Sequence, residues 1–174
     1  PRDFHASLVD VLKEFGASMI IFDILFSEPT VYDDAFSKSI KNAGNIYLPL
    51  VFYIDQKDNI NYLVTESKNI LADVSEGLKQ HIAGLGQINV VIDPDSKTRR
   101  IPLFIKYNNS FFTQLGLQAA SDWLGLNIKN ITSVRDRLII DNKLFLPILS
   151  GATFMVNYPA KWDESFTRLS YFDI

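Results

Sequence analysis

The chain has 174 residues, of which 47% are hydrophobic and 21% charged, with a formal net charge of −3 at pH 7 and no cysteine. A chain of this size buries roughly 70% of its unfolded surface in one core, so we expect a single domain over residues 1–174. The largest basic cluster is the pair Arg99 and Arg100, which excludes a typical nucleic-acid binder. The lack of cysteine excludes disulfides, thiol catalysis and thiolate metal sites.

The first third of the chain predicts alternating helices and strands. Apolar side chains three and four residues apart predict a helix over residues 3–15 that ends at Gly16, and a second helix over 33–41 that ends at Gly44. The apolar stretches 17–26 and 45–54 predict strands on either side of the second helix, as in a βαβ unit with parallel strands. The side chains expected to face inward are Leu8, Val11, Leu12 and Phe15 in the first helix, and Phe36, Ile40 and Ala43 in the second.

The middle of the chain predicts a third helix between two pairs of strands. Residues 60–64 resemble a short hairpin partner at a sheet edge, and residues 87–92 and 99–107 predict strands joined by an Asp-rich turn at 93–96. Pro102 makes the second of these an edge strand or a bulge. A helix is predicted between residues 60–64 and 87–92 from the spacing of Leu71, Val74, Leu78 and Ile82, with Gly84 or Gly86 as its end.

The last part of the chain predicts a fourth helix and short strands. Phe112, Leu115, Ala119 and Trp123 have helical spacing, and Gly125 follows as the expected end of that helix. Short strands at 137–140, 143–146 and 153–158 then form an antiparallel annex. We therefore predict an α/β fold, a three-layer sandwich with a mainly parallel central sheet and an antiparallel C-terminal annex.

Asp23 is the one carboxylate inside the first apolar strand. An unpaired buried carboxylate is costly, so Asp23 must meet backbone amides, a cation, or the open end of the sheet where α/β folds bind ligands. With Glu28, Asp33 and Asp34 it could also hold Mg²⁺. Against a metal site, Asp33 and Asp34 are explained as helix-capping residues.

Other patterns for catalysis are weak. A phosphotransfer enzyme with an aspartate nucleophile needs a second Asp two positions after the first, and Leu25 stands there. The two histidines, His5 and His81, have no nucleophile in a suitable motif, and no Gly-x-Ser-x-Gly turn occurs. We expect no enzyme activity, no cofactor and no bound metal.

A ligand crevice is expected at the carboxyl ends of the parallel strands. Arg99 and Arg100 follow the Asp-rich turn, where one of them pairs with Asp23 or Asp93 or binds an anion. Tyr158 either presents a hydrogen bond to a ligand or is tied to the backbone. We expect a small polar ligand, contacted by one of the arginines, and the candidate ligand-binding residues are Asp23, Asp33, Asp34, Asp93, Arg99, Arg100, Asn157 and Tyr158.

Several segments, taken together and in order, resemble the CHASE domain of the second type. They are Pro1-Arg2 before the first helix, residues 22–29, residues 33–36, Gly86-Gln87-Ile88-Asn89-Val90, residues 93–103 and Val156-Asn157-Tyr158. In that family, these domains are the extracytoplasmic sensor regions of bacterial adenylate or guanylate cyclases and sensor histidine kinases. The resemblance implies a periplasmic or extracellular domain, tethered to the membrane by flanking segments, in a receptor that forms a homodimer.

Two differences from the family pattern accompany this resemblance. The family has a further strand upstream of the Pro-Arg pair, so we expect the chain to be an excised domain that lacks it. In the family, Arg-Gly commonly follows Asn-Tyr, whereas Pro159, Ala160 and Lys161 follow here. Two alternatives stay open, a metal-dependent α/β hydrolase that uses Asp23 and Asp33, and a purely structural dimerisation module.

Overall fold

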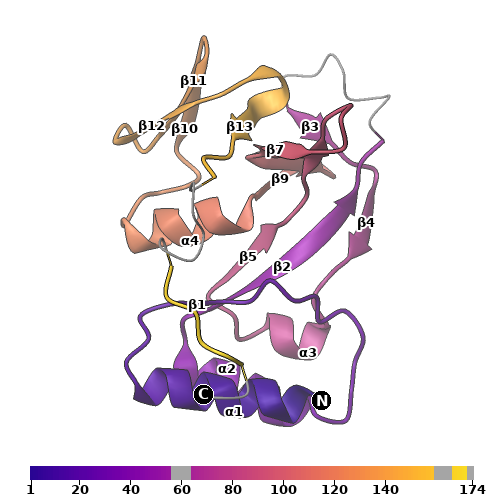
Figure 1. Cartoon of the computed structure of the whole chain (residues 1–174), viewed down its shortest axis with the longest axis vertical. Helices are drawn as coiled ribbons and strands as arrows, with labels where there is room; N and C mark the ends of the chain where they lie inside the picture. The colour runs from indigo at the N-terminus through magenta and orange to yellow at the C-terminus, as the bar shows by residue number, and fades with distance from the viewer. Residues whose placement is uncertain (56–63, 159–165, 172–174) are drawn as a thin grey trace.

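A computed structural model describes residues 1–55, 64–158 and 166–171 of the protein (Figure 1). Within them the fold is mixed α/β, as predicted, with four α-helices and several small sheets. In Figure 1 two helices lie side by side at the bottom, a third flanks the strands on the left, and the small sheets fill the upper part. The helices are α1 (Arg2–Glu14), α2 (Asp33–Ala43), α3 (Glu76–Lys79) and α4 (Leu115–Trp123).

Helices α1 and α2 form where the sequence predicts them and end at the predicted glycines. Gly16 has φ +80 and its N–H donates to Lys13 O, while the Ala17 N–H donates to Leu12 O, so the last carbonyls of α1 are satisfied. Gly44 ends α2 with φ +71. Phe36 and Ile40 of α2 are fully buried against Val9 of α1. The prediction for Phe15 is wrong, because this side chain is 82% exposed beyond the end of the helix.

The largest sheet is built on β2 (Ile46–Tyr53), whose residues are almost all buried. Its parallel neighbours are β1 (Ile20–Ile21) and β5 (Gly84–Gln87), and β4 (Asn69–Ala72) pairs with it antiparallel. The predicted parallel β–α–β connection through α2 is therefore present. A three-layer sandwich around one mainly parallel sheet is not confirmed, because the other described strands divide among three further small sheets.

Each of the other sheets has three strands. One contains β3 (Thr65–Glu66), β8 (Phe104–Tyr107) and β9 (Ser110–Thr113). Another contains β6 (Val91–Ile92), β7 (Thr98–Pro102) and β13 (Thr153–Met155). The predicted antiparallel annex is the third, with β10 (Ile131–Val134), β11 (Arg137–Ile140) and β12 (Leu144–Pro147), and its β11–β12 turn lies at Asp141 and Asn142.

The apolar stretch 17–26 is not one buried strand, contrary to the prediction. Only Ile20 and Ile21 pair with β2, and the chain then leaves the sheet. Phe22 and Phe26 turn toward the helices, where each ring packs edge to face on Phe36. Because these two rings bury the segment from one side only, the residues between them, including Asp23, are exposed.

The predicted third helix is also mostly wrong. Leu71 lies in strand β4 and is exposed, and only the single turn α3 is helical, with Leu78 buried. Gly84 and Gly86 are strand residues of β5 and do not end a helix. Their lack of a side chain has a packing reason, since a Cβ on Gly86 would lie 2.3 Å from Leu115 Cα and one on Gly84 would lie 2.6 Å from the Tyr47 ring.

Several other predicted strands and helices begin or end at different residues in the structure. The stretch 99–107 divides at Leu103 into β7 and β8, which belong to different sheets. Pro102 is the last residue of β7, and β7 is not an edge strand as predicted, because it pairs with both β6 and β13. Phe112 belongs to β9, and Trp123 at the end of α4 is exposed. The last predicted strand is present as β13 but pairs with β7 instead of the annex. The hairpin strand predicted at 60–64 lies outside the described residues except for Val64.

Candidate functional site

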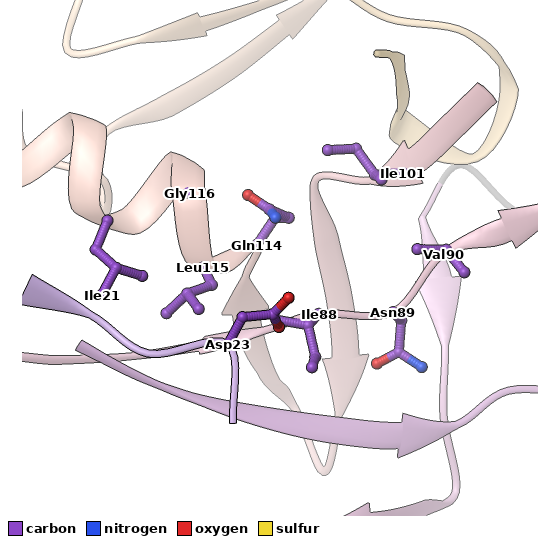
Figure 2. A pocket seen from close by; sticks show the side chains of 9 residues that line it. All are labelled: Ile21, Asp23, Ile88, Asn89, Val90, Ile101, Gln114, Leu115 and Gly116. Carbon is purple, nitrogen blue, oxygen red and sulfur yellow. The ribbon is translucent and has the colours of Figure 1, made fainter. Parts of the chain in front are cut away.

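A pocket of about 390 Å³ lies where β1 ends, beside the segment that follows β5 and the start of α4 (Figure 2). Ile101 of β7 closes one side of it. Most of the lining is aliphatic, and three side chains bring polar groups, namely Asp23, Asn89 and Gln114. The lining residues are Ile21, Asp23, Ile88, Asn89, Val90, Ile101, Gln114, Leu115 and Gly116.

Asp23 reaches this pocket because of the strand that precedes it. The Phe22 N–H donates to Tyr47 O at 3.0 Å, which holds Phe22 beside β2 with its ring in the core. Successive side chains of an extended chain point to opposite sides, so the next side chain, Asp23, turns away from that core. Its carboxylate accepts no hydrogen bond and forms no ion pair within the described part of the chain. Of the three settings that we considered for Asp23, the structure shows the open end of the sheet, and the prediction that Asp23 lies inside a buried strand is wrong.

Asn89 and Gln114 are held by backbone contacts that fix their oxygens. Asn89 Oδ1 accepts from Phe52 N at 3.0 Å and its Nδ2 donates to Phe52 O at 2.7 Å, so the side chain continues the edge of β2. Gln114 precedes the first residue of α4, and its Oε1 accepts from Leu117 N at 2.9 Å as an N-cap. Gln114 Nε2 has no hydrogen-bond partner among the described residues, so it can donate to a ligand.

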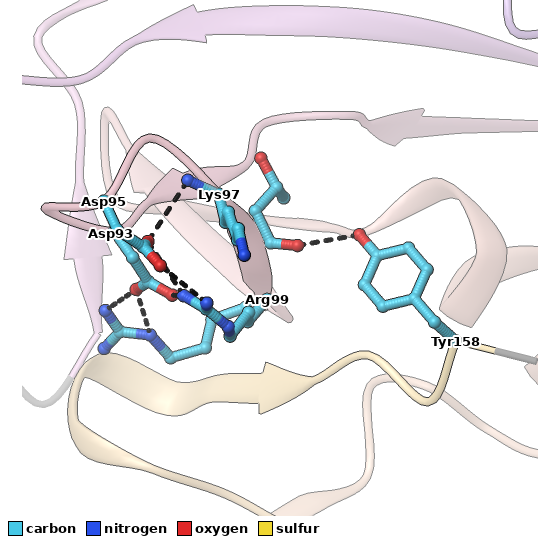
Figure 3. Close-up of polar contacts among 7 residues, drawn as sticks. Asp93, Asp95, Lys97, Arg99 and Tyr158 are labelled. Atoms are coloured by element: carbon cyan, nitrogen blue, oxygen red, sulfur yellow. Dashed lines mark hydrogen bonds and ion pairs between the residues drawn. The ribbon is translucent and has the colours of Figure 1, made fainter. Parts of the chain in front are cut away.

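Asp93, Arg99 and Arg100 form a separate cluster at the β6–β7 turn (Figure 3). Arg99 Nη1 donates to Asp93 Oδ2 at 2.9 Å and Arg100 Nε donates to Asp93 Oδ1 at 3.1 Å, while Arg99 also pairs with Asp95. Hydrogen bonds from Arg100 and Arg99 hold the pKa of Asp93 below its usual value. The hydrogen bonds that Asp95 and Asp93 accept raise the pKa of Arg99. The structural ion pair that we weighed for these arginines is present, with Asp93 and not Asp23 as the acid.

Asp33 is the first residue of α2 and its side chain reaches the start of α1. It forms an ion pair with the buried Arg2, and it accepts from Thr30 N at 3.1 Å and Thr30 Oγ1 at 2.7 Å. The predicted capping role is therefore corrected, since the capping position belongs to Tyr32 and Asp33 does not accept from the free amides of α2. Asp34, the next residue, is exposed.

Tyr158 is tied to the backbone, because its hydroxyl donates to Thr98 O at 2.9 Å (Figure 3). Its neighbour Asn157 is exposed. The eight predicted residues thus fall into three structural settings. Asp23 lines the pocket, Asp33 and Asp34 begin α2, and the other five lie on or beside β7 and its turn. Their role in ligand binding stays a prediction.

The chemistry available in the pocket is that of charge and hydrogen bonding. No group of three or more His, Asp or Glu side chains in the described ranges could hold a metal ion.

Within the same ranges no helix combines the length and the apolar character needed to span a membrane.

Sequence reasoning missed three residues that the structure makes important, Arg2, Asn89 and Gln114. Arg2 is a cation that is buried in α1. Gln114 gave no signal for a capping side chain, because it stands inside the helical spacing that begins at Phe112 and Gln is not among the residues that favour the N-cap position. Asn89 interrupts an apolar run, as Asp23 does. The burial of Arg2 and the packing of Gln114 beside β5 depend on contacts that the sequence does not reveal.

Comparison with known protein families matches residues 1–174, the whole chain, to the CHASE2 domain. No curated protein and no solved structure matches the chain significantly. The family match agrees with the resemblance of the segments around Asp23, Asp93 and Asn157. The chain therefore belongs to the CHASE2 domain family, whose members are extracytoplasmic sensory domains of signalling receptors.

Proposed function

We propose that this chain is the sensory domain of a membrane-bound bacterial receptor and that it relays a ligand or an environmental state to a cytoplasmic cyclase or histidine kinase. The observation that carries this proposal is the family match over residues 1–174. The domain acts without catalysis. In the intact receptor it lies in the periplasm or outside the cell and works as a homodimer.

The relay works by a shift between two arrangements of the receptor. A ligand changes the output only if it binds one arrangement more tightly than the other, and each tenfold preference supplies about 1.4 kcal/mol. The ligand is small and polar. The open pocket beside Asp23, with about 390 Å³, has a size within the range that protein pockets use for such ligands.

The experiment compares two substitutions of phenylalanine in the intact receptor. Phe36→Ala empties a fully buried position and destabilises the domain by about 3–5 kcal/mol. Phe111→Ala is the matched control, because the Phe111 side chain is exposed. We expect Phe36→Ala to change the rate of cyclic nucleotide synthesis or of autophosphorylation in isolated membranes, and Phe111→Ala to leave it as in the wild type.

A second measurement tests on which side of the cytoplasmic membrane the domain lies. Protease added to intact spheroplasts is expected to cleave the domain of the Phe36→Ala receptor and to leave cytoplasmic domains whole. Equal output from wild type and Phe36→Ala, or a domain that added protease reaches only after the cells are broken, would contradict the proposal. Turnover of phosphate esters by the purified chain with Mg²⁺, Mn²⁺ or Zn²⁺ would favour the hydrolase alternative.

A further inference from the structure

The pocket beside Asp23 combines an accessible negative charge with an aliphatic wall (Figure 2). Five branched side chains form that wall, and they are Ile21, Ile88, Val90, Ile101 and Leu115. None of the nine lining residues carries a positive charge. A carboxylate without a protein partner, surrounded by such groups, matches a ligand that has a cationic head and a small apolar body.

We propose that this pocket binds a small organic amine, with its protonated amino group on Asp23 and a branched aliphatic group against the wall. This inference rests on the proposed function, since it names the chemical class of the ligand that the sensory domain takes. The amino group donates to the Asp23 carboxylate, the aliphatic part covers Ile88 and Leu115, and Gln114 Nε2 donates to any acceptor that the ligand carries.

An anionic ligand fits this pocket less well. Strand β7, which contributes Ile101 to the pocket, also contains Arg99 and Arg100. These two arginines form ion pairs with Asp93 and Asp95 and do not line the pocket. The start of α4 favours negative charge, and Asp23 already places a carboxylate beside it. A ligand carboxylate would therefore meet Asp23 as a like charge, without a cation to offset it.

A metal ion also fits less well than an amine. Mg²⁺ and Ca²⁺ need about six or more oxygen ligands in a defined geometry. The side chains of the pocket offer one carboxylate and two amide oxygens, each of which already accepts a backbone N–H, so they supply fewer than six oxygen ligands. One charge-assisted hydrogen bond and an apolar contact satisfy an alkylammonium ion, for which this set of groups is sufficient.

The test uses three probes that share one branched chain and differ in the head group. Isoamylamine is cationic, isoamyl alcohol is neutral and isocaproate is anionic. Each is titrated into the protein, and affinity is read from amide chemical shifts in nuclear magnetic resonance spectra. We expect isoamylamine to bind most tightly and isocaproate least, with shifts concentrated at residues 88–90 and 114–116.

Two substitutions change the pocket charge in opposite directions. Asp23→Asn keeps the shape and removes the charge, so isoamylamine affinity should fall about tenfold, the effect of losing one charge-assisted hydrogen bond. Gln114→Glu keeps an oxygen to cap α4 and adds a negative charge, so isoamylamine affinity should rise. Asp136→Asn removes an exposed carboxylate that lies outside the pocket and is not a candidate ligand-binding residue, and it is expected to leave the affinity unchanged.

Three results would overturn the inference. They are isocaproate binding as tightly as isoamylamine, unchanged isoamylamine affinity in Asp23→Asn, and displacement of isoamylamine from Asp23 by equimolar Mg²⁺. This test measures occupancy of the pocket in the chain itself, whereas the comparison of Phe36→Ala with Phe111→Ala measures relay in the receptor. A failure of the amine site therefore leaves the proposed function standing and is distinguishable from its failure.

Discussion

The ion pair between Arg2 and Asp33 joins the beginnings of α1 and α2. Their side chains are only 9% and 15% exposed, so each charge depends on the other for compensation. Burial raises the pKa of Asp33, but hydrogen bonds from Thr30 and Arg2 and the charge of Arg2 outweigh burial, and the pKa lies below its ordinary value. The contact is a structural one that lies away from the pocket.

We predict that Asp33→Asn lowers the free energy of unfolding at neutral pH by about 1–3 kcal/mol, because the Arg2 guanidinium loses a charged partner. Since the pKa of Asp33 is lower in the folded state, the unfolded chain binds more protons as the pH falls below about 3.9. The stability that Asp33 contributes is then lost as the pH falls through the folded pKa. Urea unfolding at neutral and acid pH should show a smaller acid loss in Asp33→Asn than in wild type.

Asp34→Asn is the control for this prediction, because Asp34 is the exposed neighbour of Asp33 on the same helix. It should change stability by no more than about 0.5 kcal/mol. Equal unfolding free energies for the two variants would show that the Arg2–Asp33 pair contributes nothing.

Strand β5 and helix α4 approach each other more closely than side chains allow. A Cβ on Gly86 would lie 2.3 Å from Leu115 Cα and 2.8 Å from Leu115 N, which are backbone atoms that no rotamer change can move. This contact brings the start of α4, with Gln114 and Leu115, against the segment after β5. The pocket exists because these two elements meet there.

Gly86→Ala should therefore destabilise the protein by about 1–3 kcal/mol or more, the cost of overpacking a close contact. Gly77→Ala is the matched control within another element, since a Cβ on Gly77 in α3 meets nothing within 4 Å. That change should leave stability unchanged or raise it by about 0.4–1 kcal/mol through the unfolded state. Thermal unfolding of the two variants and of wild type tests both the expected loss of stability in Gly86→Ala and the expected unchanged or higher stability of Gly77→Ala. A Gly86→Ala protein as stable as wild type would contradict this packing.

At the scale of the whole molecule, the last described segment returns to the first helix. Figure 1 shows the yellow segment of residues 166–171 running down to α1. His5 Nδ1 and the Tyr171 hydroxyl share a hydrogen bond, and the His5 ring also packs edge to face on Phe26 with centroids 5.1 Å apart. Burial first, and the charge of Arg2 as well, lower the pKa of His5.

We predict that acidification loosens this contact between helix α1 and Tyr171. The folded pKa of His5 is below about 6.5, so the unfolded chain takes up the proton first as the pH falls. The stability from His5 is present above that value and is lost as the pH falls through the folded pKa. Urea unfolding should show a smaller loss of stability from neutral to mildly acid pH in His5→Phe than in wild type. A direct titration of the His5 imidazole by nuclear magnetic resonance that gave a pKa above 6.5 would contradict the predicted loss of stability on acidification.

Local sequence determined those parts of the protein whose signals lie within one element. Helices α1 and α2 follow from apolar side chains at helical spacing, and their ends follow from Gly16 and Gly44, which adopt the left-handed backbone that such an end requires. The Asp93 turn and the Asp141–Asn142 hairpin were likewise predictable, because Asn and Asp favour turns. Family membership was predictable too, since it depends on the order of segments along the chain.

Only the tertiary structure decided which apolar residues are buried and which polar groups are accessible. Asp23 was expected inside a covered strand, yet the strand leaves β2 after Ile21, and Asp23 is exposed among the residues that the structure describes. Leu71 lies in strand β4, as the extra residue of an irregularity, because β4 pairs with β2 there, and this pairing overrides its helical spacing. Gly86 reads as the end of a helix in the sequence and is in fact the place where α4 touches β5. Burial and close approach depend on what lies opposite in space, and a local pattern carries no information about a partner that is distant in the chain.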